Sequence, residues 1–459
     1  MTRPRREELE GLEKAELIAL IYEIFDAFEE KLEGLEKQVE ELSKGGLTSK
    51  NSSLPPSRDH KAKMEQMKSG KGKVGAIKGH ERMERKLVES PDQIIEVRAR
   101  RCSCGASLEG IEAVRVIRRQ ITELPEVKPV VIETQQAVVV CRCCGKEVRG
   151  ELPEGLESNR MFGPRLEGVV TYFQQQQHLS YERNQETLKE LFGLEISQGG
   201  LACIVKRAGM AAEARVAAIQ AEVRQARVVG SDETGARVNG QNWWEWVFRA
   251  GSAILHVIRP SRGLAVISEV MGEAKVDTWV SDCWSAQLKA PAHGHQLCLA
   301  HQIRNLEKLI EDCPRLAWAR QMQALFRRAI HLAHRRGQLT PKGFARQVRQ
   351  LEGQLQGLID RRVKNPLAHN LLKRYRKHRD HLLVFLHDPS VPHHNNDCER
   401  ALRPSVIHRK VSGGFRSQWG ADTYANLASV IDSAKATGQA VFPTLVQLMG
   451  MPVLQYLGP

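Results

Sequence analysis

Ala226-Arg227-Val228-Val229-Gly230-Ser231-Asp232 is a short apolar run that ends in a carboxylate. The pattern predicts a buried strand with Asp232 at its end. Val238-Asn239-Gly240-Gln241 then signals a tight hairpin, so two further strands are expected over 243–248 and 254–258. A helix over 264–271, a fourth strand over 278–281, a second helix and a fifth strand over 295–299 complete the series. This is the element order of a ribonuclease-H-like α/β core, in which strands 1 and 4 are neighbours.

Two more carboxylates, Asp282 and Glu399, lie where they could bind metal ions together with Asp232. Asp282 follows the fourth predicted strand, in Ser281-Asp282-Cys283-Trp284, and the pairing of strands 1 and 4 would bring it next to Asp232. Glu399 lies in Asn395-Asn396-Asp397-Cys398-Glu399-Arg400, which reads as a helix. Two carboxylates at strand ends and one from a distant helix can hold two divalent cations about 3.5–4 Å apart for phosphoryl transfer. We therefore expect these three acids to bind Mg²⁺ or Mn²⁺.

The neighbours of these acids have expected roles of their own. On a helix over 395–403, Asn395, Glu399 and Arg403 are spaced i, i+4 and i+8 and share a face. Arg403 could then contact a phosphate, and Asn395 could orient the phosphate or the metal. Asp397 points elsewhere on this helix and favours its N-terminus. Glu233 should face away from Asp232, because successive side chains of a strand alternate between its faces.

Charge is unevenly distributed along the 459 residues, whose net charge is +14. Residues 283–398 hold 20 Lys and Arg against 8 Asp and Glu, a surplus of 12. This surplus suits a track for a polyphosphate such as DNA, and the alternative is a solvated helical surface rich in Arg. Residues 315–388 read as a helical insertion into the core. No apolar run is long enough to span a bilayer and no signal peptide is evident, so a cytoplasmic protein is expected.

The N-terminal residues 1–44 are predicted to form a coiled-coil helix. Its a/d heptad stripe consists of Ile18, Ile21, Phe25, Phe28, Leu32, Leu35, Val39 and Leu42. The stripe predicts a homodimer or higher oligomer, and the alternative is a helix packed on its own chain. Residues 45–95 lack apolar periodicity and are rich in Lys, including Lys71 and Lys73. They predict a basic flexible linker that either orders on DNA or is simply solvated.

Residues 96–150 carry two groups of cysteines, each followed by glycine. Cys102-Ser103-Cys104-Gly105 and Cys141-Arg142-Cys143-Cys144-Gly145 flank two β-like runs over 114–121 and 127–140. Thiols in pairs, with glycines that let the backbone turn toward them, are typical of a zinc ribbon. Zn²⁺ would be held by Cys102, Cys104, Cys141 and Cys144, although Cys143 competes for a place and only one residue separates the first pair. The alternative is a β-hairpin with incidental thiols.

Three further features leave two interpretations each. Residues 151–225 read as helices, either a DNA-binding helix-turn-helix unit or, slightly favoured, a helical lead-in to the core. Cys298 and His301 could bind a metal together, but a buried cysteine beside a histidine that caps a helix or touches DNA is favoured. The Trp243, Trp244 and Trp246 cluster could stack on bases, but alternating aromatics in a strand more often pack in a core.

Several of these segments resemble transposases of the insertion sequence 66 family, TnpC type. The resemblance covers nearly the whole chain. It rests on the N-terminal heptads, Asn51-Ser52-Ser53-Leu54-Pro55-Pro56-Ser57, Ile121-Thr122-Glu123-Leu124-Pro125 between the cysteine groups, Asp232-Glu233-Thr234, Ser281-Asp282, Cys298-Leu299-Ala300-His301, and above all residues 395–435. The first cysteine pair and residues 411–416 depart from the family pattern.

The resemblance implies a DDE transposase that cuts the ends of a mobile element and joins them to target DNA. Asp232, Asp282 and Glu399 would be its catalytic residues, and small accessory proteins could be partners. A bacterial, nucleoid-associated location follows. The rivals are a non-catalytic DNA-binding regulator on the same scaffold and a structural nuclease of the same fold. We expect DNA contacts from Arg400, Arg403, Arg409, Lys410, Lys71 and Lys73, and support for the site from Asn395, Asn396 and His301.

The predicted architecture is multidomain α+β. Its segments are a coiled coil (1–44), a linker (45–95), a zinc-ribbon-like module (96–150), a helical region (151–225), the catalytic core with its insertion (226–440) and a C-terminal tail (441–459).

Overall fold

The computed structural model describes residues 85–152 and 160–450. The predicted coiled coil, most of the linker with Lys71 and Lys73, and the last nine residues lie outside the described residues.

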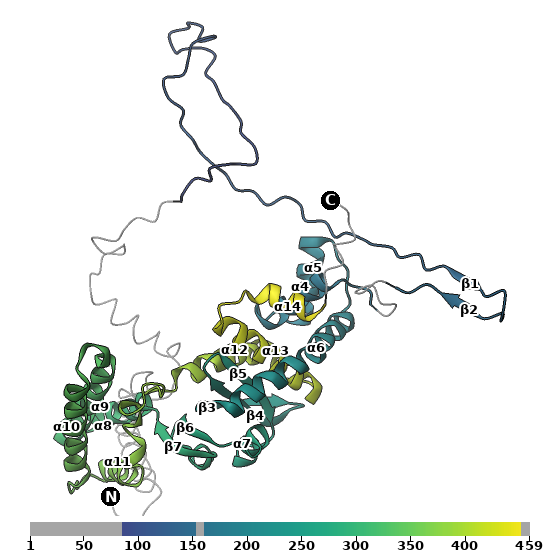
Figure 1. The fold of residues 1–459 in the computed structure, drawn as a ribbon. Coiled ribbons are helices and arrows are strands. Elements are labelled where there is room, and N and C mark those ends of the chain that lie inside the picture. Colours follow the sequence, from purple (N-terminus) through teal and green to yellow (C-terminus); the bar gives the residue numbers. More distant parts are fainter. Residues whose placement is uncertain (1–84, 153–159, 451–459) are drawn as a thin grey trace, which may run out of the picture.

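A five-stranded mixed sheet lies at the centre of the protein (Figure 1). Its strands are β3 (Val228–Val238), β4 (Gln241–Ala250), β5 (Ala253–Arg259), β6 (Val276–Ser281) and β7 (Ala292–Leu297), in the order β5-β4-β3-β6-β7. The first three strands are antiparallel, whereas β6 runs parallel to β3 and β7 parallel to β6. The predicted adjacency of the first and fourth strands is confirmed. The protein is thus a mixed α/β chain whose sheet is compatible with a nuclease-like core.

The first strand is longer than its sequence pattern predicts. Instead of ending at Asp232, β3 continues to Val238, because Ala236 and Val238 alternate into the core and pair with β4. Asn239 and Gly240, with φ of 48° and 73°, then form the predicted tight turn. The parallel pairing of β3 with β6 stops at Gly230, opposite Val280. The second half of β3 therefore has no strand on this side, and Asp232 lies at the start of that open edge.

Helices cover both faces of the sheet. The C-terminal half of α6 (Gln198–Gln225) and α7 (Leu264–Met271) pack against Trp246, Phe248 and Trp279 on one face. On the other face α12 (Asn396–Ser412) packs through Cys398 and Leu402 against Val247 and Ile254, and α13 (Gln418–Ala436) lies along β5. The helix predicted over 264–271 is confirmed. The prediction of a helix between the fourth and fifth strands is wrong, because this short connection forms only a 3₁₀ turn over Gln287–Lys289.

The helices expected before the core are present and pack against its C-terminal end. These are α4 (Pro164–Gln175), α5 (Tyr181–Phe192) and the long α6. Their apolar side chains share one cluster with Leu427 of α13 and Leu445 of α14 (Val441–Leu448). The segment expected to be a tail thus contributes a helix to the same cluster.

The basic insertion is helical and has its own core. It includes α9 (Ala317–His334), α10 (Pro341–Ile359) and α11 (Pro366–Lys377). A 3₁₀ turn over Arg336–Gln338 links α9 to α10, and two more, over Arg379–His381 and Val384–Leu386, follow α11. These helices pack on α8 (Leu299–Asp312) at the β7 side of the sheet (Figure 1). The fifth strand ends at Leu297, two residues earlier than predicted, because Cys298 caps α8.

The cysteine-bearing segment has less regular structure than expected. Within residues 85–152, strands form only at β1 (Val138–Val140) and β2 (Glu147–Arg149), which make an antiparallel hairpin. The strand predicted over 114–121 is absent, and only the end of the run over 127–140 is a strand. Apolar side chains such as Val114 and Val131 are exposed, so this alternating pattern has no second layer to pack against.

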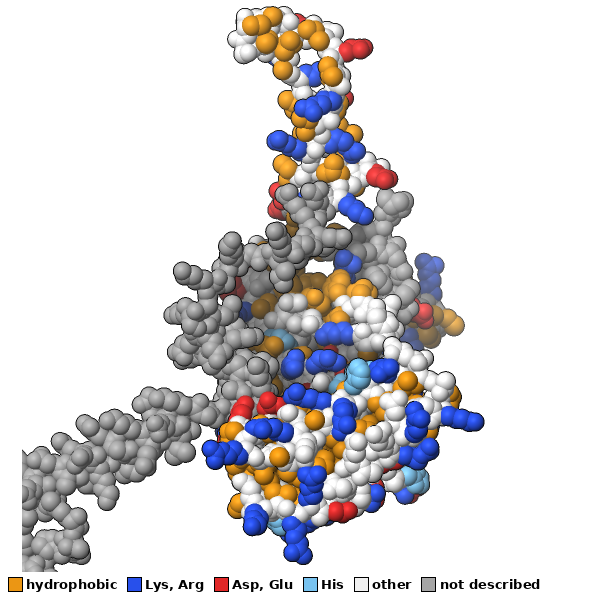
Figure 2. Space-filling view, turned by 90° about the vertical axis from the view of Figure 1, so that its left-hand side faces the viewer, with side chains coloured by type: hydrophobic (Ala, Val, Ile, Leu, Met, Phe, Trp, Pro, Cys, Tyr) orange, Lys and Arg blue, Asp and Glu red, His pale blue; other side chains and the backbone are white. Residues whose placement is uncertain are grey.

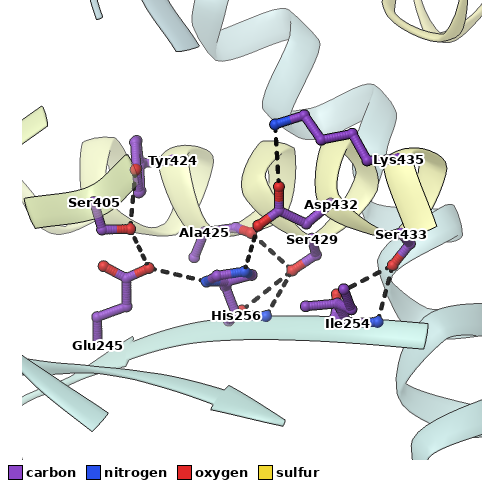
Figure 3. A network of polar contacts seen from close by, with 10 residues as sticks. All are labelled: Glu245, Ile254, His256, Ser405, Tyr424, Ala425, Ser429, Asp432, Ser433 and Lys435. Atoms are coloured by element: carbon purple, nitrogen blue, oxygen red, sulfur yellow. Dashed lines mark hydrogen bonds and ion pairs between the residues drawn. The ribbon is translucent and has the colours of Figure 1, made fainter. Parts of the chain in front are cut away.

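A buried polar network joins the sheet to α12 and α13 (Figure 3). The His256 ring on β5 contacts Glu245 Oε1 at 2.9 Å and Asp432 Oδ2 at 3.2 Å. Ser405 on α12 donates to Glu245 and accepts from the Tyr424 hydroxyl, and Ser429 accepts from the His256 backbone N–H. Burial disfavours the imidazolium, but the bonds and negative charges of the two carboxylates outweigh burial and raise the His256 pKa to about 9.

The stability given by His256 should therefore depend on pH. Because its folded pKa lies above the unfolded value near 6.5, the contribution is complete below that value and lost as pH rises through about 9. His256→Gln leaves the buried Glu245 without a cation, and Asp432 with only Lys435 at 3.4 Å, and should cost about 3–5 kcal/mol near pH 6. Urea unfolding at pH 6, 8 and 10 should show this cost shrinking with pH.

The matched control is His387→Gln, since His387 is exposed and paired with Glu352 at the surface. It should change the free energy of unfolding by at most about 0.5 kcal/mol. A cost for His256→Gln that is the same at pH 6 and pH 10 would contradict a buried imidazolium.

Candidate active site

Three elements bring Asp232, Asp282 and Glu399 to one edge of the sheet. Asp232 lies on β3 just past the last residue paired with β6, Asp282 directly follows β6, and Glu399 is in the first turn of α12. Their charges interact: burial raises the Asp232 pKa well above its usual range, and the negative charges of Glu233, Asp282 and Glu399 raise it further. A cluster of carboxylates that repel one another is the environment that a divalent cation stabilises.

Asn395 fixes the start of α12 on β3. Its buried side chain donates to the Ser231 carbonyl at 2.7 Å, and its backbone N–H donates to Cys298 Sγ at 3.2 Å. A Cβ on Gly230 would lie only 3.0 Å from Asn395 Oδ1 and 3.2 Å from Cys398 Sγ, so glycine favours this close approach. Asn395 is the N-cap of α12, and its carbonyl accepts from the Glu399 backbone N–H at 3.2 Å, so Glu399 follows it by one helical turn.

Glu399 is held by two residues of α8. Arg304 Nη2 donates to Glu399 Oε1 at 3.0 Å, and His301 Nε2 lies 3.5 Å from the same oxygen. Arg304 was not predicted from the sequence, although it stands three residues after His301 and so on the same helix face. Both contacts go to Oε1 of Glu399.

Cys298, His301 and Glu399 also lie within reach of one ion. Their ligand atoms fall within 4.8 Å of one another, the only such group of three or more that the described part of the chain contains. Burial raises the Cys298 pKa to about 11, and burial followed by the Arg304 charge lowers that of His301. A neutral thiol and a guanidinium beside the carboxylate fit a hydrogen-bonded support for Glu399 better than a soft-metal site.

Glu233 faces the opposite side of β3, as predicted. Its carboxylate accepts from Arg262 Nε at 2.9 Å and from the Gln287 amide. Gln287 in turn accepts from the Ser231 hydroxyl, which also accepts from the Trp279 indole at 2.8 Å. These bonds give Glu233 a structural role beside the acids and leave the other face to Asp232.

The basic residues expected to touch DNA occupy α12. Arg403 and Lys410 are exposed, Arg409 is half-buried near Gly235, and Arg400 is ion-paired with Asp397. Asp397 also pairs with Arg249 at 3.3 Å, and Asn396 begins the helix.

Each cysteine group forms a turn that directs backbone amides at a thiol. Gly105 and Gly145, with φ of 91° and 69°, donate to the carbonyls of Cys102 and Cys141 at 2.9 and 2.8 Å. The backbone amides of Cys104 and Cys144 are the largest causes that lower the pKa of Cys102 and Cys141. The two turns are not brought to a common point in the described structure, so the four thiols do not form one ligand set.

Comparison with known proteins identifies the family to which the chain belongs. A model described as "Transposase IS66 family" matches residues 159–423, which include all three acids and the helical insertion. The chain belongs to the IS66 transposase family. A family of unknown function (DUF6444) matches residues 1–86.

An uncharacterized protein, y4jO, from Sinorhizobium fredii is 29% identical over 163 residues, which cover 34% of this chain and 48% of that relative. The match thus spans about half the length of this curated relative. No helix in the described residues of this IS66 family member is both long and apolar enough to cross a membrane.

The repulsion at Asp232 should be measurable without catalysis. The folded pKa of Asp232 is raised, so its negative charge destabilises the folded state once pH exceeds the unfolded pKa near 3.8. Asp232→Asn should therefore raise the free energy of unfolding at pH 7.5 without added divalent cations, and this gain should vanish near pH 3.5. Glu213→Gln, which neutralises an exposed carboxylate on α6, should show no such gain. Equal stability of wild type and Asp232→Asn at pH 7.5 would refute the mutual repulsion.

Proposed function

We propose that this chain is a DDE transposase with a ribonuclease-H-like core, which cuts DNA at the ends of a mobile element and joins them to target DNA. The observation that carries the proposal is the arrangement of Asp232 on β3, Asp282 directly after β6 and Glu399 in the first turn of α12, in a member of the IS66 transposase family. Asp232, Asp282 and Glu399 would hold Mg²⁺ or Mn²⁺. When bound, such ions activate the attacking oxygen and stabilise the leaving one.

The residues around the acids suit this reaction. Asn395 and Gly230 fix α12 against β3, and Arg304 and His301 orient Glu399, so the third carboxylate is positioned before DNA binds. In the first step water attacks the phosphodiester, and the bond to the 3′ oxygen breaks to leave a 3′-hydroxyl and a 5′-phosphate. In the second step that hydroxyl attacks a target phosphodiester, forming one new P–O bond as another breaks.

The insertion supports DNA as the partner. Figure 2 shows the face formed largely by the insertion, where Lys and Arg side chains are numerous and Asp and Glu are few. This agrees with the surplus of 12 positive charges over residues 283–398. We infer that this face and the basic residues of α12 (Arg400, Arg403, Arg409 and Lys410) contact DNA phosphates.

We also propose that the two cysteine turns close on one Zn²⁺. The amides that lower the thiol pKa in each turn are the feature that stabilises thiolate ligands. We further propose that the N-terminal heptads pair two or more protomers. Small accessory proteins would be partners, and the protein would be located at the nucleoid.

The zinc site predicts a metal content. The full chain purified without chelators should contain about one zinc per chain, because four thiolates complete a tetrahedral site. Cys141→Ser with Cys144→Ser should lose it, whereas Cys203→Ser, which removes an exposed thiol on α6, should keep it. Zinc in the double variant, measured by inductively coupled plasma mass spectrometry, would overturn this assignment.

The catalytic proposal is tested with labelled DNA that flanks the gene, in Mg²⁺ or Mn²⁺. Glu399→Gln should lower nicking and joining by at least about 10²–10³-fold, because it removes one charge from the reacting centre. Asp397→Asn is the matched control: it removes the same charge from the same helical turn, but Asp397 pairs with Arg249 and Arg400 instead. Its activity should stay close to that of wild type.

Other results separate the rivals. Binding without cleavage, with or without accessory proteins, would favour a regulator on a transposase scaffold. Cleavage without joined products would favour a structural nuclease. Full activity in Glu399→Gln would exclude Glu399 as the third acid.

A further inference from the structure

A three-layer stack lies beside the acids on the other face of β3. The Arg262 guanidinium lies 4.0 Å from the ring centroid of Trp284 and 4.6 Å from that of Trp244. Its Nε also donates to Glu233 at 2.9 Å. The guanidinium is thus held between two indoles and balanced by one carboxylate, so the stack carries little net charge of its own.

Trp284 is tied to one of the candidate catalytic acids. Its backbone N–H donates to Asp282 Oδ1 at 2.8 Å, and its indole N–H donates to the Arg262 carbonyl at 3.3 Å. These two bonds fix the ring relative to Asp282. Even so, Trp284 remains 37% exposed. An indole fixed by hydrogen bonds and left open to solvent has lost its rotational freedom without gaining full burial, which stability alone does not explain.

The chemistry of this surface selects its ligand. A fixed indole face suits a flat aromatic group, and every nucleobase has such a face, whatever the sequence. Bases inside a duplex are already stacked and cannot reach it. A base turned out of the helix near a cut can, and aromatic side chains stabilise such bases in distorted DNA.

We propose that Trp284 binds an unpaired nucleobase of the DNA next to the phosphodiester that is cut. Arg262 lies against this indole and also contacts the Trp244 ring. The inference rests on the proposed function, since it places the base relative to Asp282. It assigns Trp284 a role in substrate binding and not in the chemical step.

Binding can be tested without cleavage. The full chain, without added Mg²⁺ or Mn²⁺, is titrated with a labelled oligothymidylate and with an abasic oligonucleotide of equal length, which has the same charges and no bases. Fluorescence anisotropy at fixed salt gives both affinities. Wild type should prefer the oligothymidylate by about 5- to 100-fold, the range expected from one base stack. Trp284→Ala should lose most of this preference while binding the abasic strand as wild type does.

Trp419→Ala is the matched control. Trp419 is also an exposed indole with a cation over its ring, Lys206 at 5.4 Å, but it lies in the first turn of α13. This variant should keep the wild-type preference. Trp284→Phe, which retains an aromatic face, should keep a large part of it and guards against loss through misfolding.

The outcomes distinguish this inference from the proposed function. An undiminished base preference in Trp284→Ala, or none in wild type, overturns the stacking role even if the chain cuts DNA. A preference lost only in Trp284→Ala supports it even if cleavage fails. As a direct check, 5-iodouracil in the oligonucleotide should photocrosslink to the peptide that contains Trp284, and a crosslink confined to other peptides overturns the assignment.

Discussion

The site depends on the close approach of α12 to β3 at Gly230. Asn395 donates to the Ser231 carbonyl one residue before Asp232, at a point where β3 has no β6 partner to satisfy its backbone. An unpaired buried carbonyl would cost about 1–3 kcal/mol, so this bond both completes the strand and sets the position of the helix. Glu399 follows Asn395 by one helical turn. This contact helps to set the position of the third acid relative to Asp232, together with the packing of Cys398 and Leu402 on Val247 and Ile254.

This arrangement gathers negative charge in a half-buried place, and the surrounding cations divide into two groups. Arg304 and His301 act on Glu399 from α8, whereas Arg262 acts on Glu233 from the far side of β3. Asp232 receives none of these contacts, and burial together with the charges of Glu233, Asp282 and Glu399 raises its pKa well above the ordinary range. The negative charge without a cationic partner is thus concentrated on Asp232, just past the point where β3 stops pairing with β6. An arriving cation would gain most there.

The sequence predicted the order of the strands and the places of Asp232 and Asp282 near strand ends better than it predicted the contacts around them. Val228–Val229, Asn239-Gly240 and the run before Asp282 are local signals, and each produced the expected strand or turn. The end of β3, the role of Asn395 and the contact of Arg304 with Glu399 depend on residues that are far apart in sequence. No local periodicity encodes those contacts. The strand predicted over 114–121 failed for a related reason, because its alternating pattern lacks a partner layer among the described residues.

The two faces of β3 carry different groups of side chains at this end of the sheet. One face presents Asp232 to Glu399, and the other holds Glu233, Arg262 and Trp244 in a network that ends in the exposed ring of Trp284. Asp282 belongs to both, since its charge acts on Asp232 while its Oδ1 holds the Trp284 backbone. A shift of the strand end that moved Asp282 would therefore also move the indole. Chemistry and base recognition would then be coupled through the backbone, because a single residue, Cys283, separates Asp282 from Trp284.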